Sequence, residues 1–361
     1  MWLIFLGVLA LGADTSMAFC PLIIAHRGAS GYRPEHTLAA YELAIGQGAD
    51  FLEVDVVSTR DGILIARHEN ELSETTDVAS RAEFARGRTT KHIDGDPQSG
   101  WFTEDFSLEE LKRLRATERM PVLRPQNLAY DGLFAIPTLQ EIIDLVRQQE
   151  RATGRTIGLY LETKHPTYFR SIGLPLEEKL VEVLARNGYR TGADPVFLES
   201  FETTSLRKLE ALTSLRRVQL IGSRDERPYD FIVSGDQRTM QDLLTSAGLA
   251  EVAGYAGAIG VTKEWFQPQG ESWLPAAEQL TRAAHQAGLL VHVWTFRNEN
   301  YFLPEALRLG DPADPEFLRR WGEVVTEYKQ YFGLGVDGVF SDFPATARQV
   351  VTEFQNATPC Q

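Results

Sequence analysis

Hydrophobic and polar positions alternate along this chain between two patterns. Short apolar runs bounded by polar or turn residues are typical of buried strands, and the segments between them repeat apolar positions with the period of an amphipathic helix. We expect strands over residues 22–26, 51–57, 157–162, 196–200, 217–221, 256–261, 290–296 and 338–341. We expect helices over residues 37–47, 138–151, 176–186, 203–212, 238–246, 273–287, 315–331 and 345–354. This repeated alternation of strand and helix predicts an α/β fold of the (β/α)8 TIM-barrel class.

One long stretch interrupts the alternation after the second strand. Residues 69–136 are polar, with clusters of Gly, Asp, Thr and Pro and little helical period. Because a structureless loop of that length is rare in a compact domain, we expect a small insertion over the mouth of the barrel. Its aromatic residues would either form the insertion's own small core, which we favour, or wall a substrate pocket. They are Phe84, Trp101, Phe102 and Phe106.

The chain begins with an apolar run that is too short to span a bilayer. Residues 2–11 suit the hydrophobic core of a signal peptide, and Ser16 and Ala18 are small residues at the positions that a signal peptidase reads. We therefore expect residues 1–18 to be a signal peptide, residues 19–361 to form the barrel domain, and the protein to be exported to the periplasm or secreted. The alternative is that the run forms a buried N-terminal strand.

The two cysteines, Cys20 and Cys360, lie at opposite ends of the mature chain. The first and last strands of a closed barrel are neighbours, so the two chain ends can approach each other. In an oxidising compartment a disulfide between the two cysteines is one reading, and a pair of free thiols is the other.

Composition and charge narrow the classes of partner. The 361 residues are 43% hydrophobic, enough for a large core, and the formal net charge is −14. That charge argues against nucleic acid as a partner and gives no general attraction to phosphates or anionic membranes. Any phosphate site must therefore be locally basic or hold a metal ion. No apolar run is long enough for a membrane span, so we expect no stable membrane insertion.

Chemically active side chains gather at or just beyond the ends of the expected strands. His26 ends the first strand, and Glu162 ends the third. Glu53 and Asp55 lie two residues apart on one face of the second strand, with His68 beyond it. The C-terminal strand ends of a TIM barrel form its active-site face, so these residues would converge. Carboxylates beside two imidazoles suit cleavage of a phosphate ester, which needs a cation, a group that takes a proton and a group that gives one.

Short motifs follow one another along nearly the whole chain. They are His26-Arg27-Gly28, Pro34-Glu35-His36-Thr37, Glu53-Val54-Asp55, Asp61-Gly62 before His68, Glu162-Thr163-Lys164, Glu199-Ser200-Phe201 and Ser341-Asp342-Phe343-Pro344. Taken together and in this order, they resemble the glycerophosphodiester phosphodiesterase family, most closely its periplasmic bacterial branch. The resemblance implies an enzyme that hydrolyses glycerophosphodiesters, such as glycerophosphocholine or glycerophosphoethanolamine, to glycerol 3-phosphate and an alcohol.

Three carboxylates are the candidate metal ligands. Glu53, Asp55 and Glu162 offer only oxygen, which suits Ca²⁺ or Mg²⁺ rather than zinc or copper. From spacing alone, arginines in the barrel core could instead bridge a carboxylate pair of this kind. The resemblance implies metal binding, because the family's metal ligands match these three positions. We expect one divalent cation, Ca²⁺ because the chain is expected to be exported, with Mg²⁺ as the alternative.

Two histidines and two basic residues complete the expected chemistry. His26 and His68 are the expected acid and base, because an imidazole pKa of about 6.5 lets one ring be neutral and the other charged near neutrality. The resemblance assigns Arg27 and Lys164 to the phosphate group of the substrate. From the residues alone, either cation could form only a structural salt bridge with a neighbouring carboxylate.

Two aromatic residues, and one position where the chain differs from the family pattern, bear on how the substrate fits. The resemblance places Phe201 and Trp294 as apolar walls for the glycerol carbons, and core packing is the alternative. Many family members have Asp after the second histidine, where this chain has Glu69. If Glu69 reaches the site, its longer side chain affects how the substrate fits. The histidines that we do not expect to be catalysts are His36, His92, His165, His285 and His292.

The mechanism implied by the resemblance uses the substrate's own glycerol hydroxyl, which attacks phosphorus and forms a cyclic phosphate that water then opens. Two alternatives come from other classes: a barrel like phospholipase D or C that acts on lysolipids, and a surface binding protein with the same fold. The sequence distinguishes neither the preferred head group, nor the acid from the base, nor the oligomeric state.

Overall fold

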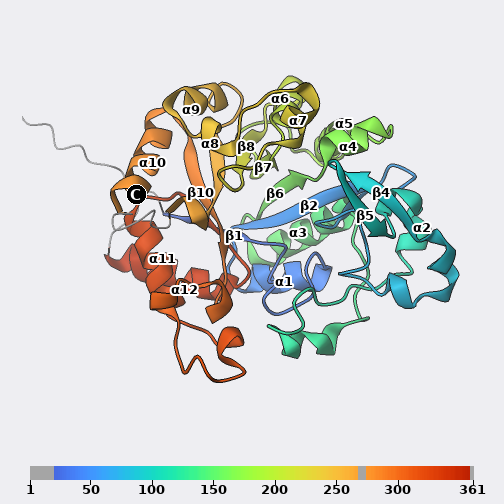
Figure 1. Cartoon of the computed structure of the whole chain (residues 1–361), viewed down its shortest axis with the longest axis horizontal. Helices are drawn as coiled ribbons and strands as arrows, with labels where there is room; N and C mark the ends of the chain where they lie inside the picture. The colour runs from blue at the N-terminus through green and yellow to red at the C-terminus, as the bar shows by residue number, and fades with distance from the viewer. Residues whose placement is uncertain (1–19, 267–273, 358–361) are drawn as a thin grey trace, which may run out of the picture.

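The computed structural model describes residues 20–266 and 274–357, and within these ranges eight parallel strands close into a barrel (Figure 1). β11 pairs with β1, and β1 pairs with β2, so the sheet has no open edge between its first and last strands. In order around the barrel, the strands are β1 (Leu22–Ala25), β2 (Phe51–Ser58), β6 (Gly158–Thr163), β7 (Val196–Ser200), β8 (Arg216–Ile221), β9 (Ala258–Thr262), β10 (Leu290–Phe296) and β11 (Gly338–Ser341). The predicted (β/α)8 architecture is confirmed.

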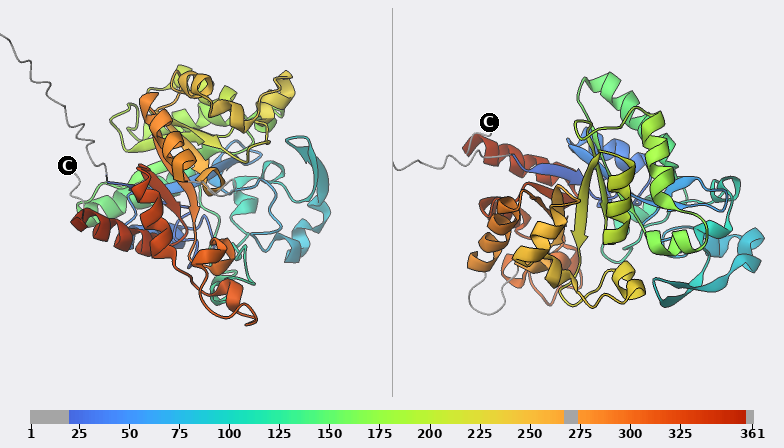
Figure 2. Two further views of the ribbon diagram at one scale, coloured as in Figure 1. Left: turned by 60° about the vertical axis from the view of Figure 1, so that its left-hand side comes forward. Right: turned by 90° about the horizontal axis from the view of Figure 1, so that it is seen from above.

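Helices cover the outside of the barrel (Figures 1 and 2). The side chains of Thr37 and Thr138 accept hydrogen bonds from backbone N–H groups in the first turns of α1 and α3, and so fix where these helices begin. The helices on the barrel are α1 (Leu38–Gly46), α3 (Leu139–Thr153), α4 (Pro166–Ser171), α5 (Leu176–Arg186), α6 (Thr203–Leu212), α7 (Tyr229–Ser234), α8 (Met240–Leu243), α9 (Ser246–Val252), α10 (Leu274–Gln286), α11 (Val324–Gly333) and α12 (Pro344–Ala357).

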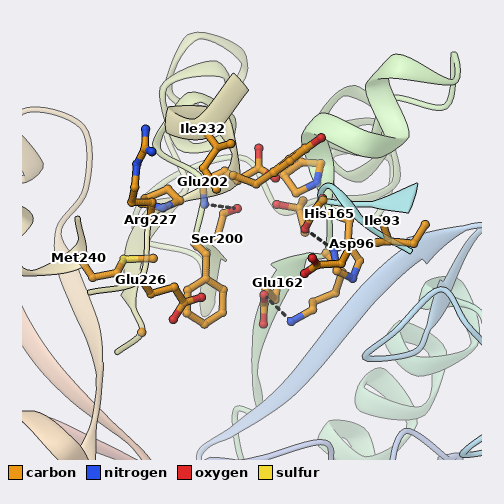
Figure 3. Close-up of a pocket in the computed structure, with 18 of the residues that line it drawn as sticks. Ile93, Asp96, Glu162, His165, Ser200, Glu202, Glu226, Arg227, Ile232 and Met240 are labelled. Carbon is orange, nitrogen blue, oxygen red and sulfur yellow. Dashed lines mark hydrogen bonds and ion pairs between the residues drawn. The ribbon is translucent and has the colours of Figure 1, made fainter. Parts of the chain in front are cut away.

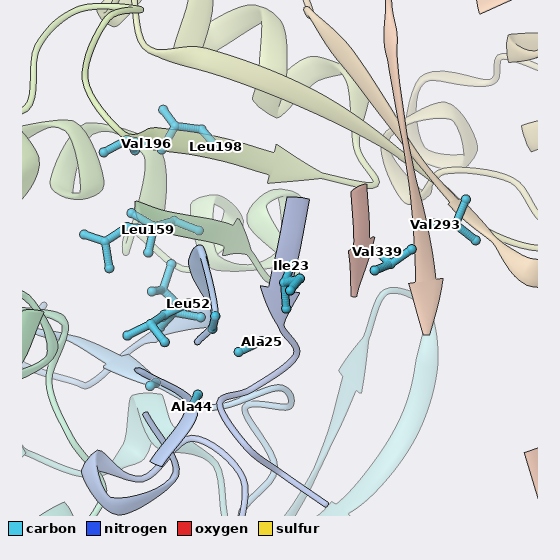
Figure 4. Packing of buried hydrophobic residues seen from close by; sticks show 14 of the residues in the cluster. Ile23, Ala25, Ala44, Leu52, Leu159, Val196, Leu198, Val293 and Val339 are labelled. Carbon is cyan, nitrogen blue, oxygen red and sulfur yellow. The ribbon is translucent and has the colours of Figure 1, made fainter. Parts of the chain in front are cut away.

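Alternation along the strands divides the buried residues into two cores. Outward-facing residues such as Ile23, Leu52 and Leu159 pack against the helices (Figure 4). Inward-facing residues fill the barrel itself, and a Cβ at Gly158 would lie 2.2 Å from the ring of Phe51, so this position requires glycine. The buried residues of the inner core are Ile24, Phe51, Tyr160, Phe197, Val218, Ala258 and Phe340.

The same alternation brings carboxylates to the C-terminal end of the barrel interior. On β2, β6 and β7, the inward-facing residue that follows the aromatic one is an acid: Glu53, Glu162 and Glu199. In the register of the sheet, Glu162 lies beside Asp55 on one side and beside Glu199 on the other. A period of two along each strand therefore assembles four acids at the C-terminal face.

His68 reaches the site through a strand that the sequence pattern did not reveal. The three-residue β3 (Leu64–Ala66) runs antiparallel to β2, with its start paired to the end of β2. The chain thus doubles back, and the N–H of Arg67 donates to the carbonyl of Asp55 at 3.1 Å. His68 follows β3 rather than β2, and it lies level with the carboxylates because of this reversal.

The segment 69–136 has its own small structure beside the barrel (Figures 1 and 2). It contains the hairpin β4 (Thr89–Ile93) and β5 (Asp96–Gly100) and the short helix α2 (Leu108–Leu111). Its four aromatic residues are buried, and three of them meet: the rings of Phe84 and Phe106 are 5.0 Å apart, and Trp101 Nε1 donates to the carbonyl of Phe84 at 2.6 Å. Phe84, Trp101 and Phe106 join the large core between barrel and helices rather than a separate core of the segment, and none of the four aromatic residues lines the site cavity or the groove beside it.

The helix expected over residues 238–246 is shorter, because α8 ends at Leu243 and a separate helix, α9, begins at Ser246. Thr245 has extended backbone (ψ 160°), and its side chain accepts a hydrogen bond from the N–H of Gly248, so it begins a new helix instead of continuing the old one. A Cβ at Gly248 would lie 2.2 Å from the carbonyl oxygen of Asp242, which shows how closely the two helices meet.

The helix expected over residues 315–331 begins only at Val324, as α11. Before it, residues 317–319 form a single 3₁₀ turn, and Trp321 pairs with Glu299 in an isolated bridge. A Cβ at Gly322 would lie 2.5 Å from the side chain of Asn300. The close approach of these loops holds the chain extended here, against its helical pattern.

Among the residues that the structure describes, no helix combines the length and the apolar character needed to cross a bilayer. The expected signal peptide, residues 1–18, and Cys360 lie outside the described residues. The export signal and the pairing of Cys20 with Cys360 therefore stay predictions.

Candidate active site

The candidate site lies where the inward-facing polar residues meet at the C-terminal ends of the strands. A cavity of about 50 Å³, called the site cavity below, shares lining residues with a larger groove of about 660 Å³. Figure 3 shows the groove. The site cavity is lined by His26, Arg27, Glu53, Asp55, His68, Glu162, Lys164, Glu199, Phe201, Leu220, Trp294 and Phe340. The structure thus brings together all nine residues that the sequence singled out for the site.

Three carboxylates meet on the inward faces of β2 and β6. Glu53, Asp55 and Glu162 are buried, and each offers an oxygen that lies within 4.8 Å of those of the other two. Burial and neighbouring carboxylates raise the pKa of Glu53 well above its usual value, and burial raises that of Glu162 to about 8. Buried carboxylates this close are costly without a cation, and an all-oxygen set fits a hard divalent ion.

Asp55 is the carboxylate whose ionised form the protein favours. Nε2 of His36 lies 2.8 Å from Asp55 Oδ2, and Nδ1 of the same ring lies 2.7 Å from the hydroxyl of Tyr41. Burial alone would raise the pKa of Asp55, but Lys164 and the hydrogen bond from His36 hold it well below its usual value. His36 therefore orients a candidate metal ligand from behind.

The turn after β1 places Arg27 against these carboxylates. Arg27 and Gly28 have positive φ values of 58° and 85°, and a Cβ at Gly28 would lie 2.8 Å from the backbone of Ala40. The N–H of Arg27 donates to Glu53 Oε2 at 2.5 Å, and its guanidinium lies 3.2 Å from Glu35. Arg27 lines the site cavity, as a phosphate-binding residue should, and it also forms an ion pair with Glu35, as a structural salt bridge would. The structure therefore supports both readings of Arg27.

His26 is held by an aspartate that follows β11. Its Nδ1 lies 2.7 Å from Asp342 Oδ1, while the other oxygen of Asp342 accepts from Arg124 at 2.6 Å and from Arg297 at 2.9 Å. Since the carboxylate occupies Nδ1, Nε2 is the nitrogen available to the cavity. Burial and the neighbouring Arg27 lower the pKa of His26 to about 4, so the ring is neutral near pH 7.

His68 is held by the carboxylate next to it in the chain. Its Nδ1 contacts the carboxylate of Glu69. The guanidinium of Arg119 donates to Glu69 at 2.6 and 3.0 Å and to Glu35 at 2.7 Å, and so links the two carboxylates. Nε2 of His68 lies 3.2 Å from Nζ of Lys164. Burial, followed by the neighbouring cations, lowers the pKa of His68 to about 3. Glu69, where the chain departs from the family pattern, therefore lies behind the imidazole and orients it.

Lys164 and two aromatic rings form one wall of the cavity. Nζ of Lys164 lies 2.9 Å from Glu162 Oε1 and 5.5 Å from the ring centre of Phe201. The rings of Phe201 and Trp294 meet edge to face, with centres 5.8 Å apart. This wall is apolar beside a cation, an arrangement that suits carbon atoms next to a phosphate.

Sequence reasoning assigned no role to Glu199, although its motif was visible. The side chain is buried at the end of β7 and lines the site cavity, and within the described part of the chain Oε2 has no hydrogen-bond partner. Burial, Glu162 and Asp55 raise its pKa well above the usual value. Glu199 therefore adds a fourth acid to the site, outside the group of three that could share one ion.

The residues that support the histidines were also missed. Arg119 and Arg124 come from the segment 69–136, and they reach Glu35 and Asp342 across the barrel mouth. No local sequence pattern marks these arginines as partners of the carboxylates, because Arg119 and Glu35 are 84 residues apart and Arg124 and Asp342 are 218 residues apart. The only available signal was the presence of Glu35 and Asp342 in motifs.

The histidines outside the expected pair have structural positions. His165 Nδ1 lies 2.5 Å from Asp94 and ties the β4–β5 hairpin to the end of β6. His292 lies inside the barrel with Nδ1 2.7 Å from the hydroxyl of Tyr160, as a core histidine should. The others are His285, which pairs with Asp337, and His92, which is exposed on β4.

Comparison with known proteins identifies one family. The sequence profile of the glycerophosphoryl diester phosphodiesterase family matches residues 26–346. A glycerophosphodiester phosphodiesterase of Arabidopsis thaliana, GDPD6, is 34% identical over 336 residues, which cover 90% of this chain and 84% of that protein. The glycerophosphodiester phosphodiesterase of Haemophilus influenzae is 28% identical, over 92% of this chain and 90% of its own.

Solved structures agree on the fold. A putative glycerophosphoryl diester phosphodiesterase from Silicibacter pomeroyi superposes with a TM-score of 0.63 at 18% identity, over 93% of this chain and 94% of its own. A phosphodiesterase from Oleispira antarctica, in complex with the product sn-glycerol-3-phosphate, superposes with a TM-score of 0.57 at 23% identity, over 92% and 97%. Both solved structures therefore support the barrel fold of this chain.

Proposed function

This chain belongs to the glycerophosphoryl diester phosphodiesterase family, and on that premise we propose that it hydrolyses glycerophosphodiesters to glycerol 3-phosphate and an alcohol with the help of one divalent cation. One observation carries the proposal: three buried carboxylates and two separately anchored imidazoles line the same cavity. The product found in the Oleispira antarctica phosphodiesterase, which shares the fold, supports this reaction.

Glu53, Asp55 and Glu162 would hold the cation. Their oxygens form a compact set, and the pKa values of Glu53 and Glu162 stay raised although Arg27 and Lys164 lie beside them, so the chain's own cations do not offset the burial of these carboxylates. We favour Ca²⁺, because Ca²⁺ accepts several carboxylates in flexible geometry and because the chain carries an expected export signal. Mg²⁺ is the alternative. The bound cation would supply positive charge that stabilises the phosphate and the attacking hydroxyl.

His26 and His68 would move the protons. In the first step the glycerol hydroxyl attacks phosphorus and gives its proton to one, neutral imidazole, while the other imidazole, which the anionic phosphate of the bound substrate would keep charged, protonates the departing alcohol. In the second step water opens the cyclic phosphate and gives its proton to the second imidazole, and the first returns its proton to the glycerol oxygen. Both rings end the cycle as they began. Asp342 and Glu69 fix the ring nitrogens that take part.

The cations and the aromatic wall would position the substrate. Arg27 and Lys164 would bind the phosphate oxygens, each exchanging part of its present carboxylate contact for them. Phe201 and Trp294 would pack against the glycerol carbons. Because attack comes from the substrate itself, a diester without a neighbouring hydroxyl should be a poor substrate. Faster turnover of bis(p-nitrophenyl) phosphate than of glycerophosphocholine would contradict this route.

The activity is tested by release of glycerol 3-phosphate from glycerophosphocholine. Purified protein should release it, EDTA should abolish the release, and added Ca²⁺ or Mg²⁺ should restore it. The ion that restores the higher rate at equal free concentration identifies the preferred metal. No release from folded, metal-loaded protein would reject the proposed function.

We also propose export, with residues 1–18 removed and residues 19–361 forming the mature enzyme with its insertion at about 69–136. The apolar run and the small residues before residue 19 support this. N-terminal sequencing of protein recovered from a bacterial periplasm should give Phe19 as the first residue. Recovery of the uncleaved chain from the cytoplasm alone would contradict export.

A further inference from the structure

The groove beside the site cavity is the space that the departing alcohol can occupy. The two share residues on one side: His68, Glu162, Lys164, Phe201 and Trp294. At about 660 Å³, the groove has the size of a small-molecule site, whereas the site cavity has room for little beyond the reacting atoms. A substrate with its phosphate in the site cavity therefore extends its alcohol portion into the groove.

Acidic side chains line the groove away from the reacting centre, and we call it the acidic groove. They come from three separate parts of the chain: Asp94 and Asp96 from the β4–β5 hairpin, Glu202 after β7, and Glu226 after β8 (Figure 3). Among the described residues, Asp96, Glu202 and Glu226 take part in no ion pair. The described chain therefore supplies no basic partner to these three acids.

Glu202 is the most deeply buried of these acids. It is only 4% exposed, and within the described residues its carboxylate meets just the hydroxyl and the N–H of Thr167. Burial, joined by Asp230 and Asp94, raises the pKa of Glu202 to about 8. Near neutral pH Glu202 is therefore largely protonated in the empty groove, and an ammonium group beside it would favour its ionised form.

The basic groups along the groove are directed elsewhere. Lys164 pairs with Glu162, and His165 pairs with Asp94. The guanidinium of Arg227 donates to the backbone carbonyl of Asp236. None of these three groups is placed against Glu202 or Glu226 in the described structure.

Aromatic faces complete the lining. Phe201 and Trp294, which are assigned to the glycerol carbons, stand where the groove meets the site cavity, and Tyr229 lines the groove beyond them, near Asp94 and Glu202. Aromatic faces beside carboxylates attract ammonium groups, including quaternary ones, because the ring quadrupole adds to the charge interaction. A neutral polyol would gain neither interaction.

We propose that the acidic groove binds an ammonium group on the departing alcohol, so that the enzyme prefers glycerophosphodiesters with a cationic head group over those with a neutral one. This inference rests on the proposed hydrolysis and adds to it a class of substrate. Choline and ethanolamine esters carry such a group, and a glycerol ester does not.

Paired kinetics test the groove. The measured quantity is the ratio of kcat/KM for glycerophosphocholine to kcat/KM for glycerophosphoglycerol, in the wild type and in Glu202→Gln/Glu226→Gln. We expect a ratio of roughly 10 or more in the wild type and a several-fold lower ratio in the variant, as removal of partly buried charge contacts requires. Glu109→Gln, the same change on exposed α2, should keep the wild-type ratio.

A second measurement needs no variant of a buried residue. Tetramethylammonium should inhibit wild-type hydrolysis of glycerophosphocholine competitively, and Glu226→Gln, a change at an exposed position, should weaken that inhibition. A wild-type ratio near 1, or equal ratios in the wild type and the double variant, would overturn the inference while the hydrolysis stands. Failure to hydrolyse either diester would instead reject the proposed function.

Discussion

The two candidate catalytic histidines are held in the same way from different parts of the fold. Each uses Nδ1 to contact a carboxylate, Asp342 for His26 and Glu69 for His68, and each carboxylate is in turn bound by arginine. Such anchoring fixes the ring and its tautomer, so that Nε2 meets the substrate in one orientation. This is the residue-level basis for expecting proton transfer at these two positions.

Replacement of either histidine should remove most of the activity. His26→Ala and His68→Ala should each lower kcat for glycerophosphocholine by roughly 10²- to 10⁴-fold, the usual contribution of a positioned acid or base. His92→Ala, at an exposed histidine on β4, should retain wild-type kcat as the matched control. Near-normal kcat in either site variant would remove that histidine from the mechanism.

The low pKa values of the two imidazoles predict the pH below which activity is lost. A base must be neutral, and burial with neighbouring cations holds His26 at about 4 and His68 at about 3. The acidic limb of kcat/KM against pH, measured with saturating metal, should therefore have its midpoint below the ordinary histidine pKa of about 6.5. A midpoint at or above 6.5 would show that neither ring is perturbed in this direction.

Sequence analysis found nine of the residues that line the site cavity, but it assigned no role to Glu199 or to the arginines that support the histidines. Glu53, Asp55 and Glu162 were visible because strand alternation and motif order mark them locally. Arg124 could not be found in this way, since its contact with Asp342 depends on how the chain folds back over 218 residues. Spacing also could not show that Arg27 and Lys164 already pair with carboxylates.

Among the elements, short ones account for most of the differences from expectation. Strands β7, β10 and β11 begin and end where the hydrophobic pattern placed them, whereas the three-residue β3 has too few positions to show a period. The predicted helix over 315–331 fails because close packing around Gly322 outweighs local propensity. These irregular segments are also the ones that carry His68 to the site and shape the barrel mouth.

The segment 69–136 is joined to the barrel through Arg124, which offers a test of how it is held. Arg124 is 1% exposed and binds Glu299 and Asp342, each at 2.6 Å. Arg124→Met would leave these buried carboxylates short of a partner and should lower the free energy of unfolding by about 3–5 kcal/mol, measured with urea.

Arg113→Met is the matched control in the same segment. Arg113 pairs with Glu83 at the surface and is 53% exposed, so the change should cost less than about 1 kcal/mol. An equal loss of stability in the two variants would mean that the buried pairs of Arg124 contribute no more than a surface ion pair.

For the whole molecule, the barrel core contains a titrating group. His292 is fully buried, and burial lowers its pKa to about 4. Between pH 6.5 and 4 the unfolded chain binds a proton at this position that the folded chain does not, so stability is lost as the pH falls through this range. The loss attributable to His292 should reach roughly 3 kcal/mol near pH 4.

Urea unfolding at several pH values isolates this effect by comparison with His292→Gln. The variant cannot take up that proton, so the difference in stability between wild type and variant should change with pH between 6.5 and 4. A difference that stays constant over this range would contradict a neutral, buried His292. Other titrating groups are common to both proteins and cancel in the comparison.

Hydrolysis should depend on one divalent cation held by Glu53, Asp55 and Glu162. Calorimetric titration of metal-free protein with Ca²⁺, repeated with Mg²⁺, measures whether that site exists. We predict binding of one ion per chain in the wild type, and loss of that binding together with hydrolysis in Glu162→Gln. Binding of the same ion with unchanged affinity and stoichiometry in Glu162→Gln would show that Glu162 is not one of its ligands.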